Sequence, residues 1–325
     1  MTYLRRYTAD DKPLWDSFVL DSKNGTFLFQ RNFMEYHQDR FVDHSLLFFD
    51  AKNRLVALLP ANETKNGKGE KTLISHQGLT YGGFILSAQS GVTHLLHCMK
   101  VLMQYLQENQ FKHFIYKAVP SIYHRLPAQE DLYALFRYNA HISACNISCS
   151  IALQSCIQTP TERRRCRGLA KAEILGYLTC EGSLSDFWPI MQDNLMQRYQ
   201  ASPVHSLSEM QLLQKTFPEN IRCVVAVDAD RKPQAGVLLF VTPQTIHVQY
   251  GHATEKGKHD GALDFLYFNV IKEYREQPQY LYFDFGTSNE QDGLILNENL
   301  IAQKEGFGAR SIIYPIYEVP IDSPP

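Results

Sequence analysis

Asp284 and His247 have side chains suited to proton transfer, and both lie on predicted strands of the second half of the chain. Asp284 is at the carboxyl end of its strand, beside Gly286, where a carboxylate can orient an amine, accept its proton, or simply cap the following turn. His247 alternates with the apolar residues of the segment TIHVQY, which makes it either a candidate base or a half-buried structural histidine.

Lys304 stands at the end of a predicted short helix, just before Gly306. A cation in that position can contact a ligand, but it can equally interact with the last helical carbonyls and the helix dipole. No Ser-His-Asp order or nucleophile elbow accompanies these residues. Direct attack within a ternary complex is therefore favoured over a covalent enzyme intermediate.

A glycine-rich turn in the first half, GLTYGG, places Tyr81 between Gly78 and the pair Gly82 and Gly83. Three glycines in six residues indicate unusual backbone angles, or close approach of a ligand or of another part of the chain. Lys117 ends a predicted strand and Tyr123 follows it. Together with residues of the second half, these form our predicted substrate-binding set: Tyr81, Gly82, Gly83, Lys117, Tyr123, Arg198, Tyr199, Tyr250, Ser288, Asn297 and Tyr317.

Four elements recur in the same order in both halves of the chain. In the first half an apolar helical face over 93–107 is followed by a strand over 113–118, a helix over 129–137 and a strand over 147–153. The second half has a helix over 263–274, a strand over 280–285, a helix over 297–305 and a strand over 311–317. The first strands begin at 113 and 280, an offset of 167 at which the other elements also fall together, so an internal duplication is indicated. The same offset pairs Lys304 with Arg137.

The segments before these elements also correspond. Predicted strands over 46–49 and 54–59 match strands over 222–227 and 235–241, and helical segments precede each pair, at 11–20 and 32–38, then at 184–199 and 208–217. We predict an α/β (α+β) fold with two tandem domains, each a mixed, mostly antiparallel sheet flanked by helices. The predicted boundaries are residues 1–155, a basic linker helix within 156–178, and residues 179–325.

Composition limits the protein classes that fit. The 325 residues are 44% hydrophobic and 20% charged with a net charge of -2, which indicates a globular protein and gives no general argument for nucleic-acid binding. Seven scattered cysteines without a CxxC pair favour neither zinc nor disulfides, and no metal is predicted. The opening residues lack a signal-like apolar stretch, so the cytoplasm is the expected location. The arginines at 163–165 and 167 form a basic segment, either a solvated connector or an anion contact.

The order of elements, doubled within one chain, resembles the GNAT order of the Fem-type peptidoglycan aminoacyltransferases and their acetyltransferase-like relatives. The most specific likeness covers about forty residues near the end: Phe283-Asp284-Phe285-Gly286, then Leu296-Asn297, then Lys304-Glu305-Gly306-Phe307-Gly308, and the tyrosines Tyr314 and Tyr317. Gln303 stands where a Phe is usual, and no long charged helical hairpin is present.

The resemblance implies an N-acyltransferase of cell-envelope or polysaccharide precursors, acting on an amine acceptor. It gives Lys304 a contact with the phosphate of the donor or with the developing oxyanion. The donor stays open between acyl-CoA and aminoacyl-tRNA, although the missing hairpin weakens tRNA. A phosphate-binding loop of the GNAT kind would fall within 251–262, where Lys258 and Gly261 give a partial match and are the predicted cofactor-binding residues. The alternative functions are an inactive ligand-binding protein and a tRNA-dependent transferase.

Overall fold

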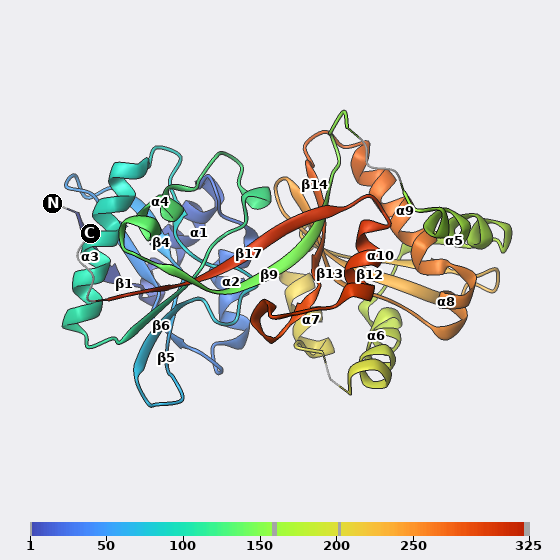
Figure 1. The fold of residues 1–325 in the computed structure, drawn as a ribbon, viewed down its shortest axis with the longest axis horizontal. Helices are drawn as coiled ribbons and strands as arrows, with labels where there is room; N and C mark the ends of the chain where they lie inside the picture. Colours follow the sequence, from blue (N-terminus) through green and yellow to red (C-terminus); the bar gives the residue numbers. More distant parts are fainter. Residues whose placement is uncertain (1, 158–160, 201–202, 322–325) are drawn as a thin grey trace. The chain divides into compact units, whose positions relative to one another are not determined.

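The computed structural model describes residues 2–157, 161–200 and 203–321, and for Arg198 and Tyr199 it describes the main chain only. The chain forms two compact units that are discontinuous in sequence (Figure 1). Unit 1 contains residues 1–146, 291–295 and 313–325, and unit 2 contains residues 147–290 and 296–312. The helix predicted as a linker belongs to unit 2. The domain boundaries predicted from the sequence follow the duplicated order of elements, and they stay a prediction.

Unit 1 has helices on two short sheets. One sheet has the antiparallel order β1-β3-β4-β7, and a second set of strands runs β17-β8-β6-β5-β2, in which β6 and β8 are parallel. The helices are α1 (Lys12–Asp21), α2 (Arg31–Met34), α3 (Val92–Glu108) and α4 (Glu130–Arg137), with 3-10 turns η1 (Ala9–Asp11), η2 (Phe27–Phe29), η3 (Glu35–His37), η4 (Ser121–Tyr123) and η5 (Gln291–Gly293). The strands are β1 (Tyr3–Arg6), β2 (Val42–Asp43), β3 (Leu46–Phe49), β4 (Leu55–Leu59), β5 (Asn62–Lys65), β6 (Lys71–Ser75), β7 (Ile85–Leu86) and β8 (His113–Lys117).

The core of unit 1 lies between α3 and these strands. The predicted apolar face of the helix is buried, with Leu95, Met99, Leu102 and Leu106 all at most 1% exposed. They pack with strand residues such as Phe114 in one hydrophobic cluster. Apolar side chains at helical spacing thus hold α3 against the sheet, as the sequence predicts.

Unit 2 has one sheet with the order β10-β11-β12-β13-β14-β9, followed by β17. All of its pairs with a described register are antiparallel except β13 with β14. The strands are β10 (Leu178–Glu181), β11 (Ile221–Val227), β12 (Pro233–Val241), β13 (Thr245–Ala253), β14 (Tyr282–Thr287) and β15 (Asn289–Glu290), with β9 (His141–Ala152), β16 (Ile295–Leu296) and β17 (Arg310–Val319) divided between the units. The helices are α5 (Arg163–Ile174), α6 (Leu184–Tyr199), α7 (Leu207–Thr216), α8 (Glu255–Asp260), α9 (Ala262–Arg275) and α10 (Glu298–Glu305).

Helices cover both faces of the unit 2 sheet. On one face α9 packs on β11, β12 and β13, and α5 lies alongside α9 (Figure 1). Leu266 and Val270 of α9 pack there with Val237 and Phe283 in one hydrophobic cluster. Helices α6 and α7 also pack on the sheet, and Phe187 of α6 lies against the Cα of Gly236. The predicted fold class of mixed, mostly antiparallel sheets flanked by helices is confirmed.

Two predicted segments differ in detail. The helix expected over 32–38 is one turn of α-helix followed by a 3-10 turn. The segment 251–262, expected as a phosphate loop, contains the short helix α8, whose N-cap Thr254 accepts from the amide of Gly257. A side-chain cap supplies the start signal that turns this stretch into helix.

Candidate active site

The parallel strands β13 and β14 separate at a defined point in unit 2. Their pairing covers Thr245 to His247 on β13 and Tyr282 to Asp284 on β14, and both strands continue beyond it. A cavity of about 380 Å³ lies beyond this point. Its lining comes from β13, the end of β14, β15, α6, α8, α9 and α10. It includes Asn194, Gln249, Tyr250, Lys258, Thr287, Asn289, Glu290, Asn297, Gln303 and Lys304.

The last paired residues, His247 and Asp284, form a buried dyad. His247 Nδ1 is 2.8 Å from Asp284 Oδ2, and the Ser148 hydroxyl donates to Asp284 Oδ1 at 2.5 Å. Asp284 is fully buried and His247 is 9% exposed. Their side chains leave the strands on the face opposite Phe283 and Phe285, so neither lines the cavity. A buried carboxylate that accepts two such bonds is held in one orientation.

Lys304 reaches the same point of the sheet from α10 and lines the cavity. Its ammonium group donates to the carbonyl oxygens of Gly286 at 2.8 Å and Thr287 at 2.7 Å. Burial lowers the pKa of Lys304 to about 8, while the negative charge of Asp284 acts in the opposite direction. The three residues predicted as catalytic are thus brought together, one in the cavity wall and two directly behind it.

Gly286 makes this arrangement possible. Its φ is +76°, a conformation that side chains rarely adopt, and a Cβ at this position would lie 3.4 Å from His247 Cε1. The glycine therefore lets β14 turn away from β13 beside the imidazole, with its carbonyl directed at Lys304.

A second cavity of about 390 Å³ adjoins the first and shares Lys258, Leu263 and Gln303 with it. It lies between α5, α8 and the start of α9. Among the described residues, five cations line it against one carboxylate, Asp264: Arg164, Arg165, Arg167, Lys171 and Lys258. Gly261, one of the two predicted cofactor-binding residues, also lines it, at the N-cap of α9.

The predicted residues of unit 1 do not join these cavities. Tyr81 is buried, donates to Thr26 at 3.2 Å and packs on Tyr123, whose hydroxyl lies 3.0 Å from that of Tyr314. Lys117 donates to the carbonyls of His76 and Leu79, and burial lowers its pKa to about 8. These hydrogen bonds and ring contacts of Tyr81, Tyr123 and Lys117 are therefore made with other residues of the protein.

The paired glycines have a packing reason. A Cβ on Gly82 would collide with the carbonyl of Ser75, and one on Gly83, whose φ is +81°, would lie 2.6 Å from the Tyr116 hydroxyl. Tyr317 is half-buried against the core of unit 1. The structural interpretation of the glycine-rich turn therefore accounts for both glycines.

Four further predicted positions lie in unit 2. Asn297 lines the first cavity and caps α10, accepting from the amide of Leu300. Ser288 is fully buried and outside the cavity lining. The side chains of Arg198 and Tyr199, at the end of α6, lie outside the described residues.

Sequence comparisons identify no relative: no protein-family model matches the chain, and no curated protein matches it. Several solved structures do match its fold. The crystal structure of FemX is similar at a TM-score of 0.68 and 10% identity, covering 97% of this chain and 96% of that one. L-PGS from Bacillus licheniformis has a TM-score of 0.58 at 12% identity over 95% and 91% of the two chains. A tandem GNAT protein from the clavulanic acid biosynthesis pathway has 0.53 at 10% identity over both full lengths.

The chain has a tandem GNAT fold. At 10 to 12% identity these likenesses concern the fold alone. They confirm the Fem-like, doubled architecture that the sequence resemblance predicts.

The two halves of the tandem GNAT fold differ at the matching positions. At the 167-residue offset Asp284 corresponds to Lys117, and Lys304 corresponds to Arg137. Lys304 is buried, whereas Arg137 is exposed on α4. The duplicated half thus repeats the backbone elements without the buried carboxylate and the cavity-lining lysine.

Sequence reasoning missed several residues of this candidate site. Ser148 was not singled out, although the polar-apolar alternation of Ser148, Cys149 and Ser150 could have shown which face of β9 meets Asp284. Asn194, Asn289, Glu290 and Gln303 line the cavity from α6, the two-residue strand β15 and α10, at positions that carry no local signal.

Within the described residues no group of three or more His, Cys, Asp or Glu side chains could hold a metal ion. No helix in the described part of the chain is both long and apolar enough to cross a membrane. The seven cysteines all fall within the described ranges, and each is a free thiol.

Proposed function

We propose that the chain is an N-acyltransferase that moves an acyl or aminoacyl group from an activated donor to an amine, and that unit 2 carries the reaction. The observation that supports this most is the position of Lys304, a buried lysine in the wall of a cavity formed where β13 and β14 separate. We further propose that the acceptor is an envelope or polysaccharide precursor that bears an amine.

Lys304 would stabilise the negative charge that develops on the carbonyl oxygen. An ammonium group has three N–H donors, and the Gly286 and Thr287 carbonyls take two of them. The third is left for a ligand in the cavity. With a pKa of about 8 the side chain is still mostly protonated at neutral pH. A fixed donor in a partly dry site provides more stabilisation than the same donor in water.

Asp284 and His247 would act through Lys304, because neither lines the cavity. The Asp284 carboxylate opposes the effect of burial on the Lys304 pKa and so favours the charged amine. His247 and Ser148 fix that carboxylate by hydrogen bonds to its two oxygens. We assign Asp284 and His247 as positioning residues, whereas the sequence suggested proton transfer for them.

Other oxygen atoms in the cavity lining suit an amine acceptor. Glu290, Asn289 and Asn297 line the cavity with side-chain oxygens that can accept from an ammonium or amine group. Tyr250 also lines the cavity, and its hydroxyl is 2.9 Å from His205 Nδ1. We propose that these residues orient the amine toward the donor carbonyl.

The basic second cavity would hold the phosphate groups of the donor. Cations in the first turn of a helix are disfavoured by the helix dipole, so the arginines at the start of α5 are not explained by helix stability. The Gly168 carbonyl packs against Gly261 and covers the start of α9. Side chains of α5 and α8, rather than backbone amides of α9, would therefore contact the phosphates. Acyl-CoA and aminoacyl-tRNA both carry such groups.

The test compares donors and variants of the full chain. We expect binding of acetyl-CoA, a longer acyl-CoA or an aminoacyl-tRNA by titration calorimetry. The double variant Arg164→Ala/Arg167→Ala should weaken binding at least about tenfold, since each lost charge-assisted bond contributes more than about 1.5 kcal/mol. Lys304→Ala should leave donor binding in place and lower transfer to a model amine by about a hundredfold or more.

Lys52→Ala provides the matched control, because Lys52 is exposed in the turn between β3 and β4 of unit 1. Failure of all three donors to bind would overturn the transferase proposal and favour a ligand-binding protein. Binding of aminoacyl-tRNA alone would identify the donor.

A further inference from the structure

Unit 1 contains a cavity of about 820 Å³ that the proposed acyl transfer does not use. We propose that it binds a neutral or amino sugar. The cavity lies between the start of the chain, α2 and the segment that leads into β2, and its lining includes Tyr7, Arg31, Glu35, Gln38, Asp39, Arg40, Phe41, Asp43 and His76.

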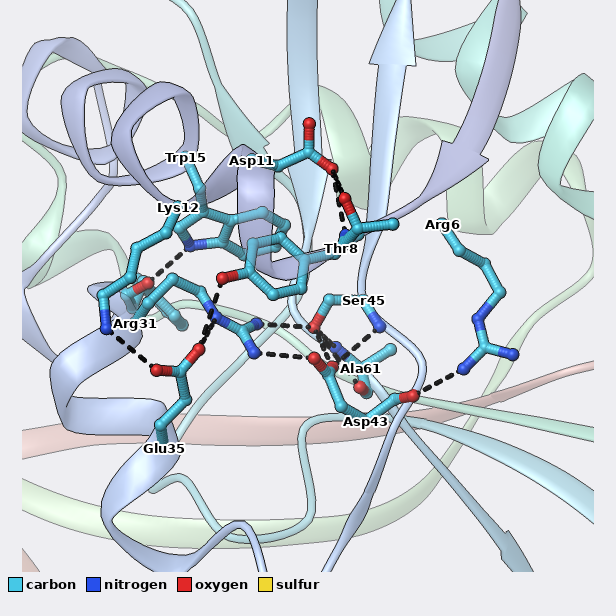
Figure 2. Close-up of polar contacts among 12 residues, drawn as sticks. Arg6, Thr8, Asp11, Lys12, Trp15, Arg31, Glu35, Asp43, Ser45 and Ala61 are labelled. Atoms are coloured by element: carbon cyan, nitrogen blue, oxygen red, sulfur yellow. Dashed lines mark hydrogen bonds and ion pairs between the residues drawn. The ribbon is translucent and has the colours of Figure 1, made fainter.

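A closed network of charges forms one wall of this cavity (Figure 2). The guanidinium of Arg31 donates to Glu35 at 3.0 Å, to Asp43 at 2.6 Å and to the Ser45 hydroxyl at 3.3 Å. Its carbon lies 3.7 Å from the ring centroid of Tyr7, and the residue is 3% exposed. Arg31 is thus committed to internal partners, and it fixes two carboxylates at the cavity wall.

Those carboxylates remain accessible as hydrogen-bond acceptors. Side-chain exposure is 28% for Glu35 and 36% for Asp43. Asp43 accepts from Arg31 and twice from Ser45, and Glu35 accepts from Arg31, Lys12 and Tyr7. A carboxylate offers about four acceptor positions, so each can take a further hydrogen bond from a ligand.

The charge balance of the lining disfavours an anionic ligand. Among the described lining residues, two cations, Arg31 and Arg40, stand against three carboxylates, Glu35, Asp39 and Asp43. His76 adds no charge near neutral pH, because burial lowers its pKa to about 3. The basic cavity of unit 2 has the opposite balance, so the two cavities would select different chemical groups.

The remaining groups match a sugar ring. Hydroxyls need fixed acceptors and an amide, which Glu35, Asp43 and Gln38 supply, and the apolar face of a sugar packs on an aromatic ring such as Phe41. An amino group on the sugar would gain further from the excess of carboxylates. Chemistry of this kind suits glucosamine or N-acetylglucosamine and disfavours a sugar phosphate. This site does not depend on acyl transfer in unit 2, and either could be present without the other.

The test measures sugar binding to the full chain by saturation-transfer NMR and titration. We expect N-acetylglucosamine and glucosamine to bind, and glucose 6-phosphate to bind more weakly. Gln38→Ala, at an exposed position, should weaken N-acetylglucosamine about three- to tenfold, the contribution of one or two neutral hydrogen bonds. Gln104→Ala, at an exposed position of α3 outside this cavity lining, is the matched control and should change nothing.

A second variant tests the charge argument. Asp39→Lys should weaken glucosamine and strengthen glucose 6-phosphate, with folding verified by circular dichroism. The proposal is overturned if neither neutral nor amino sugar binds at about 10 mM, the weak end of specific recognition. It is also overturned if glucose 6-phosphate binds the unaltered chain better than glucosamine does.

Discussion

Lys304 combines burial with hydrogen bonds to two main-chain carbonyls, an environment in which a lysine can lose its proton near neutral pH. Burial disfavours the charged form, and the negative charge of Asp284 only partly offsets this, so the pKa of Lys304 is about 8. The ordinary pKa of an exposed lysine is about 10.4. The reactive state of this residue is therefore set by its neighbours.

Replacement of Asp284 should change that titration in a predictable direction. We expect the pKa of Lys304 to fall below about 8 in Asp284→Asn, because the charge that favours the ammonium form is removed. The measurement is NMR of 13C-labelled lysine side chains across about pH 6 to 11. Lys117 of unit 1, whose pKa burial also lowers to about 8, should titrate identically in both proteins. A Lys304 pKa that rises in the variant would contradict the proposed role of Asp284.

Much of this site could be predicted from residue types and strand positions. Asp284 was singled out by its place at a strand end, His247 by strand alternation, and Lys304 by its place at a helix end together with the family resemblance. The structure places the three residues together. Arg137, by contrast, shares the position of Lys304 in the repeat but is exposed. Matching positions in a duplicated chain indicate that the same backbone element recurs. They do not indicate whether a side chain is buried, because burial depends on the neighbours that pack against it.

At the scale of secondary-structure elements, α5 and α9 pack in close contact. The two helices meet at glycines: a Cβ on Gly168 would collide with Asp264, and one on Gly261 with the Gly168 carbonyl. Arg165 of α5 bonds Asp264 of α9 at 2.5 Å. Close contact and an ion pair thus fix the helices that carry the basic cavity.

Gly261→Ala should destabilise this junction. The residue has a φ of +81°, which costs alanine about 1 to 2 kcal/mol, and the added methyl also has to displace backbone. Gly176 has a φ of +76° with nothing within 4 Å, so Gly176→Ala carries the first cost alone. We expect thermal unfolding, followed by circular dichroism, to begin at a clearly lower temperature in Gly261→Ala than in Gly176→Ala. Equal midpoints would show that the close contact contributes nothing.

Long elements with a regular pattern of apolar residues could be predicted from the sequence, whereas very short elements could not. The helices at 92–108 and 262–275 follow directly from spacing at about 3.6 residues per turn. The strands β2, β7, β15 and β16 contain two residues each, too few for any alternation to be recognised. The cavity of unit 1 is lined partly from such a segment, Val42–Asp43, so it could not be anticipated.

At the scale of the whole molecule, the last strand of the chain completes the sheet of unit 1. Residues 316–319 of β17 pair with β8, and residues 148–152 of β9 pair with β14 in the sheet of unit 2. A side-chain bridge adds to the first pairing, because His113 of β8 bonds Glu318 of β17 at 2.8 Å and Glu70 at 3.0 Å.

This bridge makes the attachment of β17 dependent on pH. The hydrogen bonds to Glu318 and Glu70 raise the pKa of His113 above its ordinary value of 6.5. Its stabilisation is therefore fully present below about pH 6.5 and is lost as the pH rises through the raised value. We expect amides of β8 and β17 to exchange faster at about pH 9 than at about pH 6, after correction for intrinsic rates.

His113→Gln should remove this pH dependence while β11 and β12 of unit 2 behave alike in both proteins. The opposite result, equal pH dependence with and without the imidazole, would assign the effect to other groups.

The pairing of β8 with β17 also affects how the protein folds during its synthesis on the ribosome. His113 and Glu318 are 205 residues apart, so β8 cannot pair with β17 until the intervening chain has been synthesised. At about 5 to 20 residues per second that interval lasts roughly 10 to 40 seconds. Throughout it, a nascent chain exposes an open strand edge to every other nascent chain nearby. Slow translation would lengthen this exposure. A chaperone that covers the edge of β8 would lower the chance of aggregation during that time.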